Sequence, residues 1–433
     1  MARILNSTDA DFREAFTALL EAKREEEADV ADIVSDIIRD VRTRGDEALY
    51  ELTERFDRFD VRDTGLAVSP EEVEKAKARV PAEVLEALQL AADRIRAYHE
   101  RQLPADETYV DDIGVELGHR WTPVDAAGLY VPGGLAAYPS SVLMNAIPAR
   151  VAGVKRLVMV VPTPEGKFND LVLAAADAAG VDEIWRIGGA QAVAALAWGT
   201  ESIRPVDVIV GPGNAFVAEA KRQVFGKVGI DMIAGPSEVL AIADDSADPE
   251  WLAADLLAQA EHDRSAQSIL VTTDAALAQA VAQAVERQLE TLPKADIAGE
   301  SWEKYGAIII VKDMDEAAAV SDAFAPEHLE LSVRDPDALL ARVRHAGAIF
   351  IGHHTPEAVG DYVAGPNHVL PTSRSARFSS GLNVLNFMKR TTLLRCSPES
   401  LRLIGPAAVT LAEVEGLEAH ARSVARRLGW QRG

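Results

Sequence analysis

The chain has 433 residues, of which 48% are hydrophobic and 26% charged, and its formal net charge is −24. This length favours roughly two to four domains, and the negative charge makes nucleic acid and anionic membranes poor partners because their phosphates are repelled. No apolar run approaches the ~20 residues of a membrane helix and the first residues lack a secretory-signal pattern, so we expect a cytoplasmic protein.

The first hundred residues predict helices. Val30, Ile33, Val34, Ile37, Ile38 and Val41 form one stripe at helical spacing, which Gly45 ends, and a second amphipathic stretch covers about 71–99. The segment 128–145 is rich in glycine, proline and small residues. This change in composition indicates that a new structural region begins there.

Short apolar runs then alternate with helical stretches. They cover residues 156–162, 183–189, 206–213, 238–244, 268–273, 307–312, 328–333 and 348–352. Such runs predict parallel strands buried on both faces, and eight of them exceed one ordinary sheet, so we expect two lobes that divide near Gly235 and Pro236. Ligands of open parallel sheets lie beyond the carboxyl ends of the strands, where we expect the chemistry.

The C-terminal part, after about residue 381, predicts helices and no further strong strand. It contains Cys396, the only cysteine of the chain. An intrachain disulfide and a cysteine-ligated metal site are therefore excluded. No histidine neighbours this cysteine in the sequence, so a structural or unreactive thiol is a more common interpretation than a catalytic nucleophile.

Two glycine-rich segments follow predicted strands. GGAQAVAAL and GPGNAFVAEA place Gln191 and Asn214 at helix starts. Backbone N–H groups there can hold phosphate or ribose oxygens even in an acidic protein. Neither segment is a complete GxGxxG, and the pattern alone leaves a cofactor site and a tight turn about equally open.

Polar groups in three other segments are candidates for metal binding and acid–base chemistry. In QAEHD, Gln259 and His262 are three residues apart and project from the same side of a helix, or from the edge of that side, where they could bind a metal. Such a pair alone more often marks the polar edge of the buried face of a helix. In PEHLELSV, Glu327 and His328 begin a strand and could act as two proton acceptors, although this segment alone is more often a solvated turn. In GDYVAGPNHVLPT, Asp361 lies on a bent path and is a plausible metal ligand.

The motifs VPGG, GGAQAVAALA, GPGN, AGPSE, QAEHD, APEHLE, GDYVAGPNHVLPT and EGLEAH occur in this order through nearly the whole chain. Together they resemble the histidinol dehydrogenase family. The resemblance implies an α/β fold of two incomplete Rossmann-like lobes with parallel sheets, plus small helical N- and C-terminal elements. We expect an N-terminal helical element at 1–25, a first lobe formed by 26–129 and 237–381, a second, NAD-binding lobe at 130–236, and a C-terminal helical segment at 382–433 that reaches the partner subunit.

The resemblance also implies an activity and its site residues. The enzyme would be a homodimer with shared active sites that oxidises L-histidinol to L-histidine, through L-histidinaldehyde and with two NAD⁺, at the end of histidine biosynthesis. His328 would take the hydroxyl proton and Glu327 would activate water. The remaining residues carried over by motif are Gln259, His262, Asp361 and His420 for one Zn²⁺ per subunit, these four with Ser237, His328, His368 and Glu415 for the substrate, and Tyr130, Gln191 and Asn214 for NAD⁺.

Two alternatives remain open on the sequence. A paralogous zinc- and NAD-dependent dehydrogenase could act on another alcohol such as a sulfonated diol, although the Glu415 carboxylate would repel a sulfonate. A non-catalytic two-lobed binding protein would explain the lobes but not the base and the metal ligands. Zinc and manganese both suit an oxygen–nitrogen site. One residue departs from the family pattern: Pro366 stands where members often carry a small polar residue, and no ligand is lost.

Overall fold

The computed structural model describes residues 2–22, 30–133, 138–233 and 235–430. The chain forms two compact units. The first comprises 1–101 and 125–387, and the second comprises 102–124 and 388–433. The first unit contains two parallel sheets and the second an antiparallel sheet.

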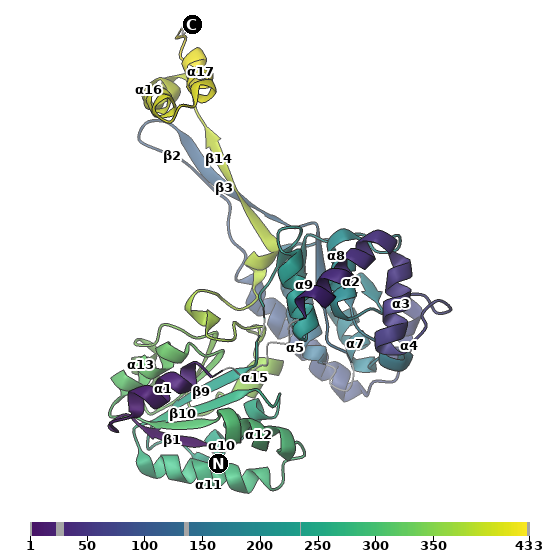
Figure 1. Cartoon of the computed structure of the whole chain (residues 1–433). Helices are drawn as coiled ribbons and strands as arrows, with labels where there is room; N and C mark the ends of the chain where they lie inside the picture. Colours follow the sequence, from purple (N-terminus) through teal and green to yellow (C-terminus); the bar gives the residue numbers. More distant parts are fainter. Residues whose placement is uncertain (1, 23–29, 134–137, 234, 431–433) are drawn as a thin grey trace. The chain divides into compact units, whose positions relative to one another are not determined.

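The first sheet has six parallel strands in the order β1-β11-β10-β9-β12-β13. Figure 1 labels β1, β9 and β10 of this sheet. Their bounds are Arg3–Asn6 (β1), Glu238–Ala243 (β9), Gln267–Thr272 (β10), Ala307–Ile310 (β11), His328–Ser332 (β12) and Ala348–Ile351 (β13). Successive side chains of β9 point to opposite faces, so Val239 and Ala241 pack with one set of helices while Leu240 and Ile242 pack with another. The helices on the first face are α10 (Pro249–Ala260), α11 (Ala275–Leu289) and α12 (Ala295–Tyr305), and those on the second are α1 (Phe12–Leu20), α13 (Met314–Phe324) and α14 (Pro336–Leu340).

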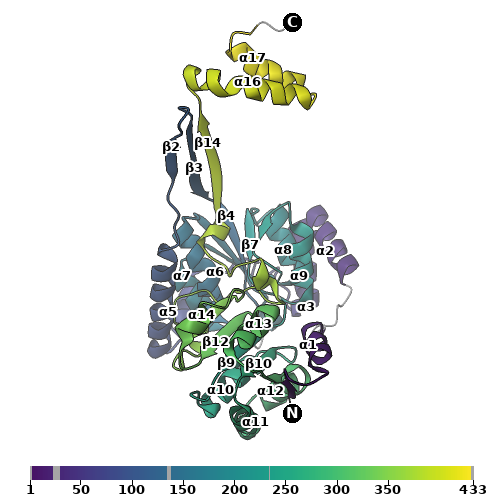
Figure 2. The ribbon, with the colours of Figure 1, turned by 90° about the vertical axis from the view of Figure 1, so that its left-hand side faces the viewer.

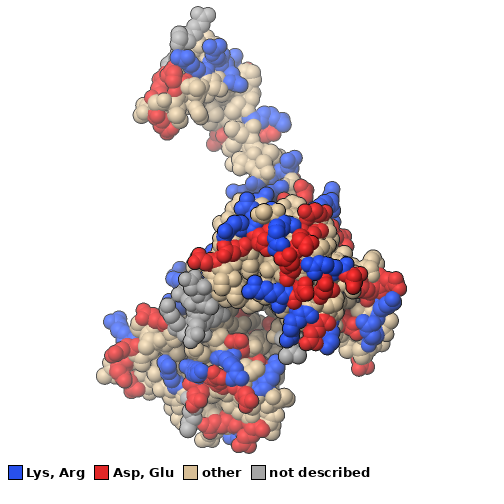
Figure 3. All heavy atoms as spheres, turned by 45° about the vertical axis from the view of Figure 1, so that its right-hand side comes forward, with Lys and Arg blue, Asp and Glu red and all other residues tan. Residues whose placement is uncertain are grey.

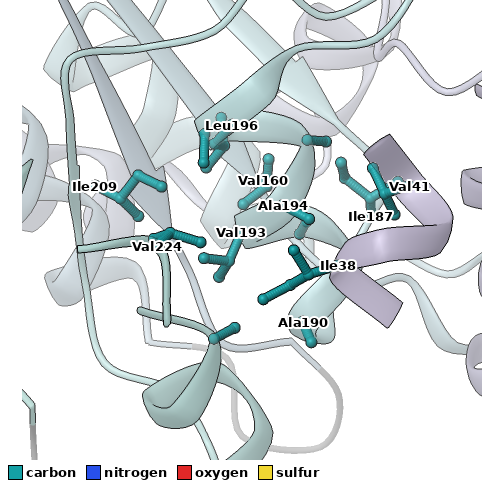
Figure 4. Close-up of a cluster of buried hydrophobic side chains, with 14 of the residues drawn as sticks. Ile38, Val41, Val160, Ile187, Ala190, Val193, Ala194, Leu196, Ile209 and Val224 are labelled. Atoms are coloured by element: carbon teal, nitrogen blue, oxygen red, sulfur yellow. The ribbon is translucent and has the colours of Figure 1, made fainter. Parts of the chain in front are cut away.

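The second sheet has five parallel strands in the order β6-β5-β4-β7-β8. Their bounds are Ala126–Tyr130 (β4), Arg156–Val160 (β5), Glu183–Trp185 (β6), Val208–Val210 (β7) and Gly229–Ile230 (β8). One hydrophobic core joins this sheet to α2 (Ala31–Arg44), α3 (Asp46–Asp57), α8 (Gly189–Trp198) and α9 (Ala215–Val224). In Figure 4, Ile38 and Val41 of α2 lie among Ile187, Ala190 and Val193.

Further helices of this lobe pack on one another. Helix α6 (Pro139–Ala152) contacts β4 and β5, and α5 (Ala82–Glu100) and α7 (Asp170–Ala179) pack on α6. Helix α4 (Pro70–Lys77) packs on α7. The remaining elements of the first unit are α15 (Glu357–Tyr362) and the short 3₁₀ turns at Pro164–Gly166, Ser375–Arg377 and Val384–Phe387.

All eight predicted strands are present and parallel, which confirms the two-sheet α/β fold. Strands β1, β4 and β8 were not predicted. Strand β4 has the sequence AAGLY, in which the small residues hide the strand pattern. A side chain at Gly128 would come within 2.9 Å of the Leu196 Cδ1 atom, so the close packing of α8 on β4 requires glycine.

Two parts of the predicted domain division differ from the structure. Residues 26–129 were assigned to the first lobe, but α2 to α5 pack on the second sheet and its helices. Residues 1–25 were predicted to be a separate helical element, but β1 extends the first sheet and α1 packs on that sheet. An amphipathic stripe indicates which face of a helix is buried, and it does not indicate the sheet against which that face packs.

The second unit has an antiparallel sheet and two helices. Strands β2 (Glu107–Val110) and β14 (Met388–Arg395) both pair with β3 (Glu116–Pro123), as Figure 2 shows. Helices α16 (Pro398–Val414) and α17 (Glu418–Arg427) pack together through a core that contains Val409 and Ala421. The prediction of no strand after 381 was wrong, because β14 is exposed along most of its length and has no apolar run. The half-buried Cys396 lies between β14 and α16.

The surface carries both signs of charge. Acidic and basic side chains are interspersed on the face drawn in Figure 3. Many pair at helical spacing, as Lys75 Nζ does with Glu71 Oε1 at 2.7 Å. Among the described residues, no helix has both the length and the apolar character that crossing a membrane requires.

Candidate active site

A cavity of about 570 Å³ in the first unit contains most of the predicted site residues. Its walls include the 211–214 segment, which follows β7 of the second sheet, and Ser237, Glu327 and His328 of the first sheet. In the second sheet, β5 and β6 follow β4 on one side and β7 and β8 lie on its other side, so the strand order reverses between β4 and β7. The expected position of a ligand beyond the carboxyl ends of these two strands agrees with the cavity.

The first sheet contributes its opposite edge to the cavity. Ser237 precedes β9, and Glu327 and His328 lie at the start of β12. The expectation that all the chemistry lies beyond carboxyl ends was therefore wrong for this sheet. His353 lies near the carboxyl ends of β9 and β12, outside the cavity lining, and its ring hydrogen bonds to Ser332 Oγ at 2.7 Å and to Ser246 Oγ at 3.2 Å.

His328 is held so that one ring nitrogen is free to act as a base. Its Nδ1 lies 3.0 Å from the backbone oxygen of Glu238, to which it donates a hydrogen bond when protonated. Its Nε2 is buried, has no hydrogen-bond partner among the described residues and lies 3.7 Å from Asp361 Oδ1. Burial disfavours the charged ring, but the carboxylates of Glu357, Glu327 and Asp361 outweigh burial and raise the pKa of His328 well above its ordinary value.

Glu327 is a buried carboxyl group beside this base. Its Oε2 accepts a hydrogen bond from the backbone N–H of Glu238 at 3.0 Å and lies 3.8 Å from His328 Nδ1. Burial raises the pKa of Glu327 to about 7, against the opposing influence of His328. A carboxyl group with this pKa can give or take a proton near neutral pH.

Beside this pair, the structure gathers side chains that can hold a cation. Ligand atoms of His262, Glu357 and Asp361 all lie within 4.8 Å of one another. The Nε2 of Gln259 is 3.3 Å from His262 Nδ1. Gln259 Oε1 and Glu357 Oε2 are buried and have no hydrogen-bond partner among the described residues. Unpartnered oxygens beside a histidine and a carboxylate fit a divalent metal ion, which would satisfy them.

Asp361 lies in the last turn of α15 and not on the bent path expected from the sequence, while His368 lies in the loop that follows, and two hydrogen bonds anchor this segment. His368 Nδ1 lies 2.9 Å from the backbone oxygen of Asp361, and Asn367 donates a hydrogen bond from Nδ2 to the backbone oxygen of Met144 at 2.7 Å. Burial disfavours the Asp361 carboxylate, but the nearby ring of His328 and the charges of His368 and His262 outweigh burial and lower the pKa of Asp361. Asp361 is therefore ionised and ready to bind a cation. The unusual Pro366 leaves this anchoring intact.

The three predicted NAD contacts lie around glycine-rich loops of the second lobe. Tyr130 and Gln191 are buried, and the Tyr130 hydroxyl accepts a hydrogen bond from the backbone N–H of Gly189 at 3.0 Å. Neither residue lines the cavity as described. Asn214 lines the cavity, and its side-chain oxygen caps α9 by accepting from the N–H groups of Phe216 and Val217.

Comparison with known proteins identifies the family. The family model of histidinol dehydrogenase matches residues 20–428. The histidinol dehydrogenase of Ruegeria pomeroyi is 65% identical over 428 residues, which cover 99% of each chain. The chain belongs to the histidinol dehydrogenase family. The relative from Rhodospirillum rubrum is 64% identical over 430 residues and 99% of each chain. A crystal structure of histidinol dehydrogenase from Elizabethkingia anophelis has 36% identity and a TM-score of 0.94, and the match covers 99% of this chain and 98% of that one.

Membership of the histidinol dehydrogenase family confirms the resemblance inferred from the motifs. The chain is therefore an oxidoreductase of histidine biosynthesis, and the alternative of a non-catalytic binding protein is wrong. A dehydrogenase of a sulfonated diol is not favoured, since relatives of at least 60% identity over nearly the whole chain are histidinol dehydrogenases.

Two residues that the family resemblance assigned to the site lie in the second unit. Glu415 ends α16 and His420 lies in the first turn of α17, and both are exposed. The structure thus brings together Ser237, Gln259, His262, Glu327, His328, Asp361 and His368 within one unit, and it leaves Glu415 and His420 on another.

The sequence analysis missed two buried carboxyl groups and one half-buried carboxyl group close to the candidate metal site. Glu357 belongs to the candidate metal group, and Glu330 and Asp255 lie behind it. One signal was available: Glu330 is a charged residue in the predicted buried strand HLELS, where charge is rare unless paired.

Proposed function

We propose that this protein is a zinc-dependent histidinol dehydrogenase, which oxidises L-histidinol to L-histidine through L-histidinaldehyde and reduces two NAD⁺. The observation that carries the proposal is that His328, His262 and Asp361 line one cavity and that the unpartnered oxygens of Gln259 and Glu357 lie beside this group. An alcohol bound to a cation at this group would present its hydroxyl group to the base. We also propose a cytoplasmic location, where the NAD⁺ pool is available to a biosynthetic enzyme.

The proposed zinc ligands are Gln259, His262, Asp361 and, from the partner subunit of a homodimer, the residue at position 420. Support comes from the nitrogen and oxygen donors of the first three residues and from the unpartnered Gln259 oxygen. When bound, the ion supplies a fixed point for the substrate amine and imidazole, so that the reacting carbon is positioned before chemistry begins.

Proton transfer is the task of His328 and Glu327. In its neutral form, in which Nδ1–H donates a hydrogen bond to the Glu238 carbonyl, His328 can accept the hydroxyl proton on Nε2 while hydride leaves the carbon that bears the hydroxyl group for NAD⁺. We assign activation of water for the second oxidation to Glu327, whose raised pKa suits a proton acceptor near neutral pH. Ser237 and His368 line the same cavity and would contact the substrate.

NAD⁺ binding is assigned to the second lobe. Backbone N–H groups of the glycine-rich segments that follow β6 and β7 suit the pyrophosphate, with Tyr130, Gln191 and Asn214 close to those segments. The Tyr130 hydroxyl is neutral, since burial raises its pKa to about 12. It therefore adds no charge against an anionic cofactor.

A homodimer with shared active sites is supported by the exposed apolar residues of the second unit. Leu394 is 67%, Leu411 64% and Val414 82% exposed. Apolar residues gathered this densely on a small unit indicate a covered surface. Glu415 and His420 are exposed beside them and would complete the active site of the partner subunit.

An absorbance assay for NADH tests the activity. Protein purified without added metal should reduce two NAD⁺ per L-histidinol, lose activity with a chelator, and regain it with Zn²⁺. His353→Asn is a matched control for His328→Asn, because His353 lies near the opposite end of β12 and outside the cavity lining. Turnover of a sulfonated diol without turnover of L-histidinol would overturn the proposed function.

A further inference from the structure

Three carboxyl groups form a layer behind the cavity. Glu330 and Glu357 are 4% and 2% exposed, and Asp255 is half-buried. None of them is among the described residues that line the cavity. Buried carboxyl groups are costly unless they are paired, so their retention requires an explanation.

Each of these three carboxyl residues lies on the same face of its helix or strand as a residue of the proposed active site, one helical turn or two strand positions away. Asp255 precedes Gln259 by four residues on α10, and Glu357 precedes Asp361 by four residues on α15. Glu330 follows His328 by two residues on β12. Residues four apart on a helix, or two apart on a strand, share a face. The layer therefore contacts the three elements that carry the proposed ligands and the base.

Hydrogen bonds join these three elements. The Oε1 of Glu330 accepts from the backbone N–H of Glu357, at the first residue of α15, at 2.9 Å. The carboxyl groups of Glu330 and Asp255 hydrogen bond to each other, which requires that one of them carries a proton. Burial raises the pKa of both carboxyl groups, to about 6 for Asp255, and so favours that proton. The Glu330 side chain thereby links β12 to both α15 and α10, two helices that also contact each other. Figure 1 labels both helices beside the first sheet.

We propose that Asp255 and Glu330 are positioning residues that hold α10 and α15 against β12, so that Gln259 and Asp361 can bind one metal ion. This inference rests on the metal site of the proposed function. Neither residue is a ligand itself. Glu330 fixes the start of α15, and Asp255 fixes the orientation of Glu330.

The expected effect is a loss of metal affinity. Groups that orient metal ligands typically account for 10–100-fold in affinity or activity. Glu330→Leu removes the acceptor of the Glu357 N–H, which frees the start of α15. Glu330→Gln keeps an amide oxygen for that N–H and an amide donor for the Asp255 carboxylate. Both variants lose the carboxyl group, and only Glu330→Gln can still form the two hydrogen bonds.

The experiment measures Zn²⁺ affinity of metal-free, full-length protein by competition with a chelating dye, and NAD-dependent turnover is recorded in parallel. Glu330→Leu should bind Zn²⁺ about 10–100-fold more weakly than wild type, and Glu330→Gln should stay within about threefold. Asp255→Ala should also weaken binding, and Asp255→Asn should restore it. Asp255 is half-buried, so its variants test the inference if Glu330→Leu does not fold.

The matched control is Asp57→Leu in the other lobe. The buried Asp57 carboxylate accepts from the backbone N–H of Thr163 at 2.8 Å, so its loss also removes a buried acceptor. This control should lower stability and leave Zn²⁺ affinity unchanged. Equal Zn²⁺ affinity in wild type, Glu330→Leu and Asp255→Ala would overturn the positioning role while leaving the proposed function intact. A wild-type protein that does not bind Zn²⁺ would overturn both.

Discussion

Replacing Lys221 with methionine tests how the glycine-rich 211–214 segment is held. Lys221 and Asp231 form an ion pair in which the side chains are 3% and 1% exposed. Lys221 Nζ also donates to the backbone oxygen of Gly211 at 3.0 Å, and Asp231 Oδ2 accepts from the backbone N–H of Gly211 at 2.8 Å. The pair thus fixes both polar groups of the first residue of this segment.

Lys221→Met leaves the Asp231 carboxylate buried without its counter-charge. Breaking a buried pair by removing one partner costs about 3–5 kcal/mol. The double variant Lys221→Met/Asp231→Asn removes both charges and keeps an oxygen for the Gly211 N–H. It should therefore regain more than half of the lost free energy of unfolding. Lys75→Met is the control, since Lys75 and its partner Glu71 have side chains 64% and 76% exposed, and it should leave unfolding unchanged.

Urea unfolding followed by circular dichroism gives the free energies of unfolding of wild type, Lys221→Met, Asp231→Asn, the double variant and Lys75→Met, and initial rates give KM for NAD⁺. The looser segment should raise KM for NAD⁺ more than it lowers kcat at saturating cofactor. A double variant as unstable as the sum of its two single variants would refute the reasoning, because the two charges would then act independently.

Three further predictions concern the proposed active site. His328→Asn should lower kcat for both oxidation steps by about 10²–10⁴-fold, as the loss of a general base does, and wild-type turnover would remove His328 from this role. Glu327→Gln should impair L-histidinaldehyde oxidation more than L-histidinol oxidation in single-turnover assays; equal losses in the two half-reactions would contradict its role in activating water. Metal-free protein should lose about 1–2 kcal/mol of stability between pH 7 and 9, because burial raises the pKa of Glu327 to about 7 and of Glu357 to about 8, and protons bound only in the folded state are released in this range. Denaturation midpoints measured with a chelator at pH 7 and pH 9 test the direction of this change. A higher midpoint at pH 9 would contradict the prediction.

The sequence predicted the strands that consist of a continuous run of apolar residues. The runs that became β9, β10 and β11 consist largely of branched apolar residues, and such residues fit a strand buried on both faces. Strand β4 escaped prediction because the close approach of α8 requires small residues there. Strand β14 escaped because an exposed antiparallel strand needs no apolar run. Local composition therefore predicted buried strands better than tightly packed or exposed ones.

The candidate site residues came from the family resemblance, and only the fold shows which of them lie close together. Nothing in the spacing of Gln259, His328 and Asp361 indicates that α10, β12 and α15 converge. Glu330 and Glu357 were missed for the same reason, since their partners lie on other elements. The general rule for parallel sheets placed ligands at carboxyl ends, whereas the first sheet contributes its amino edge, where a strand-starting N–H such as that of Glu238 can hold a carboxylate.

The single thiol of the chain offers a spectroscopic label for following subunit exchange in the proposed homodimer. Cys396 is half-buried and lies at the junction of β14 and α16, in the unit that also carries Glu415 and His420. A maleimide dye can be attached there without engineering a labelling position. Mixing donor-labelled and acceptor-labelled protein would then follow the swapping of chains in real time through energy transfer.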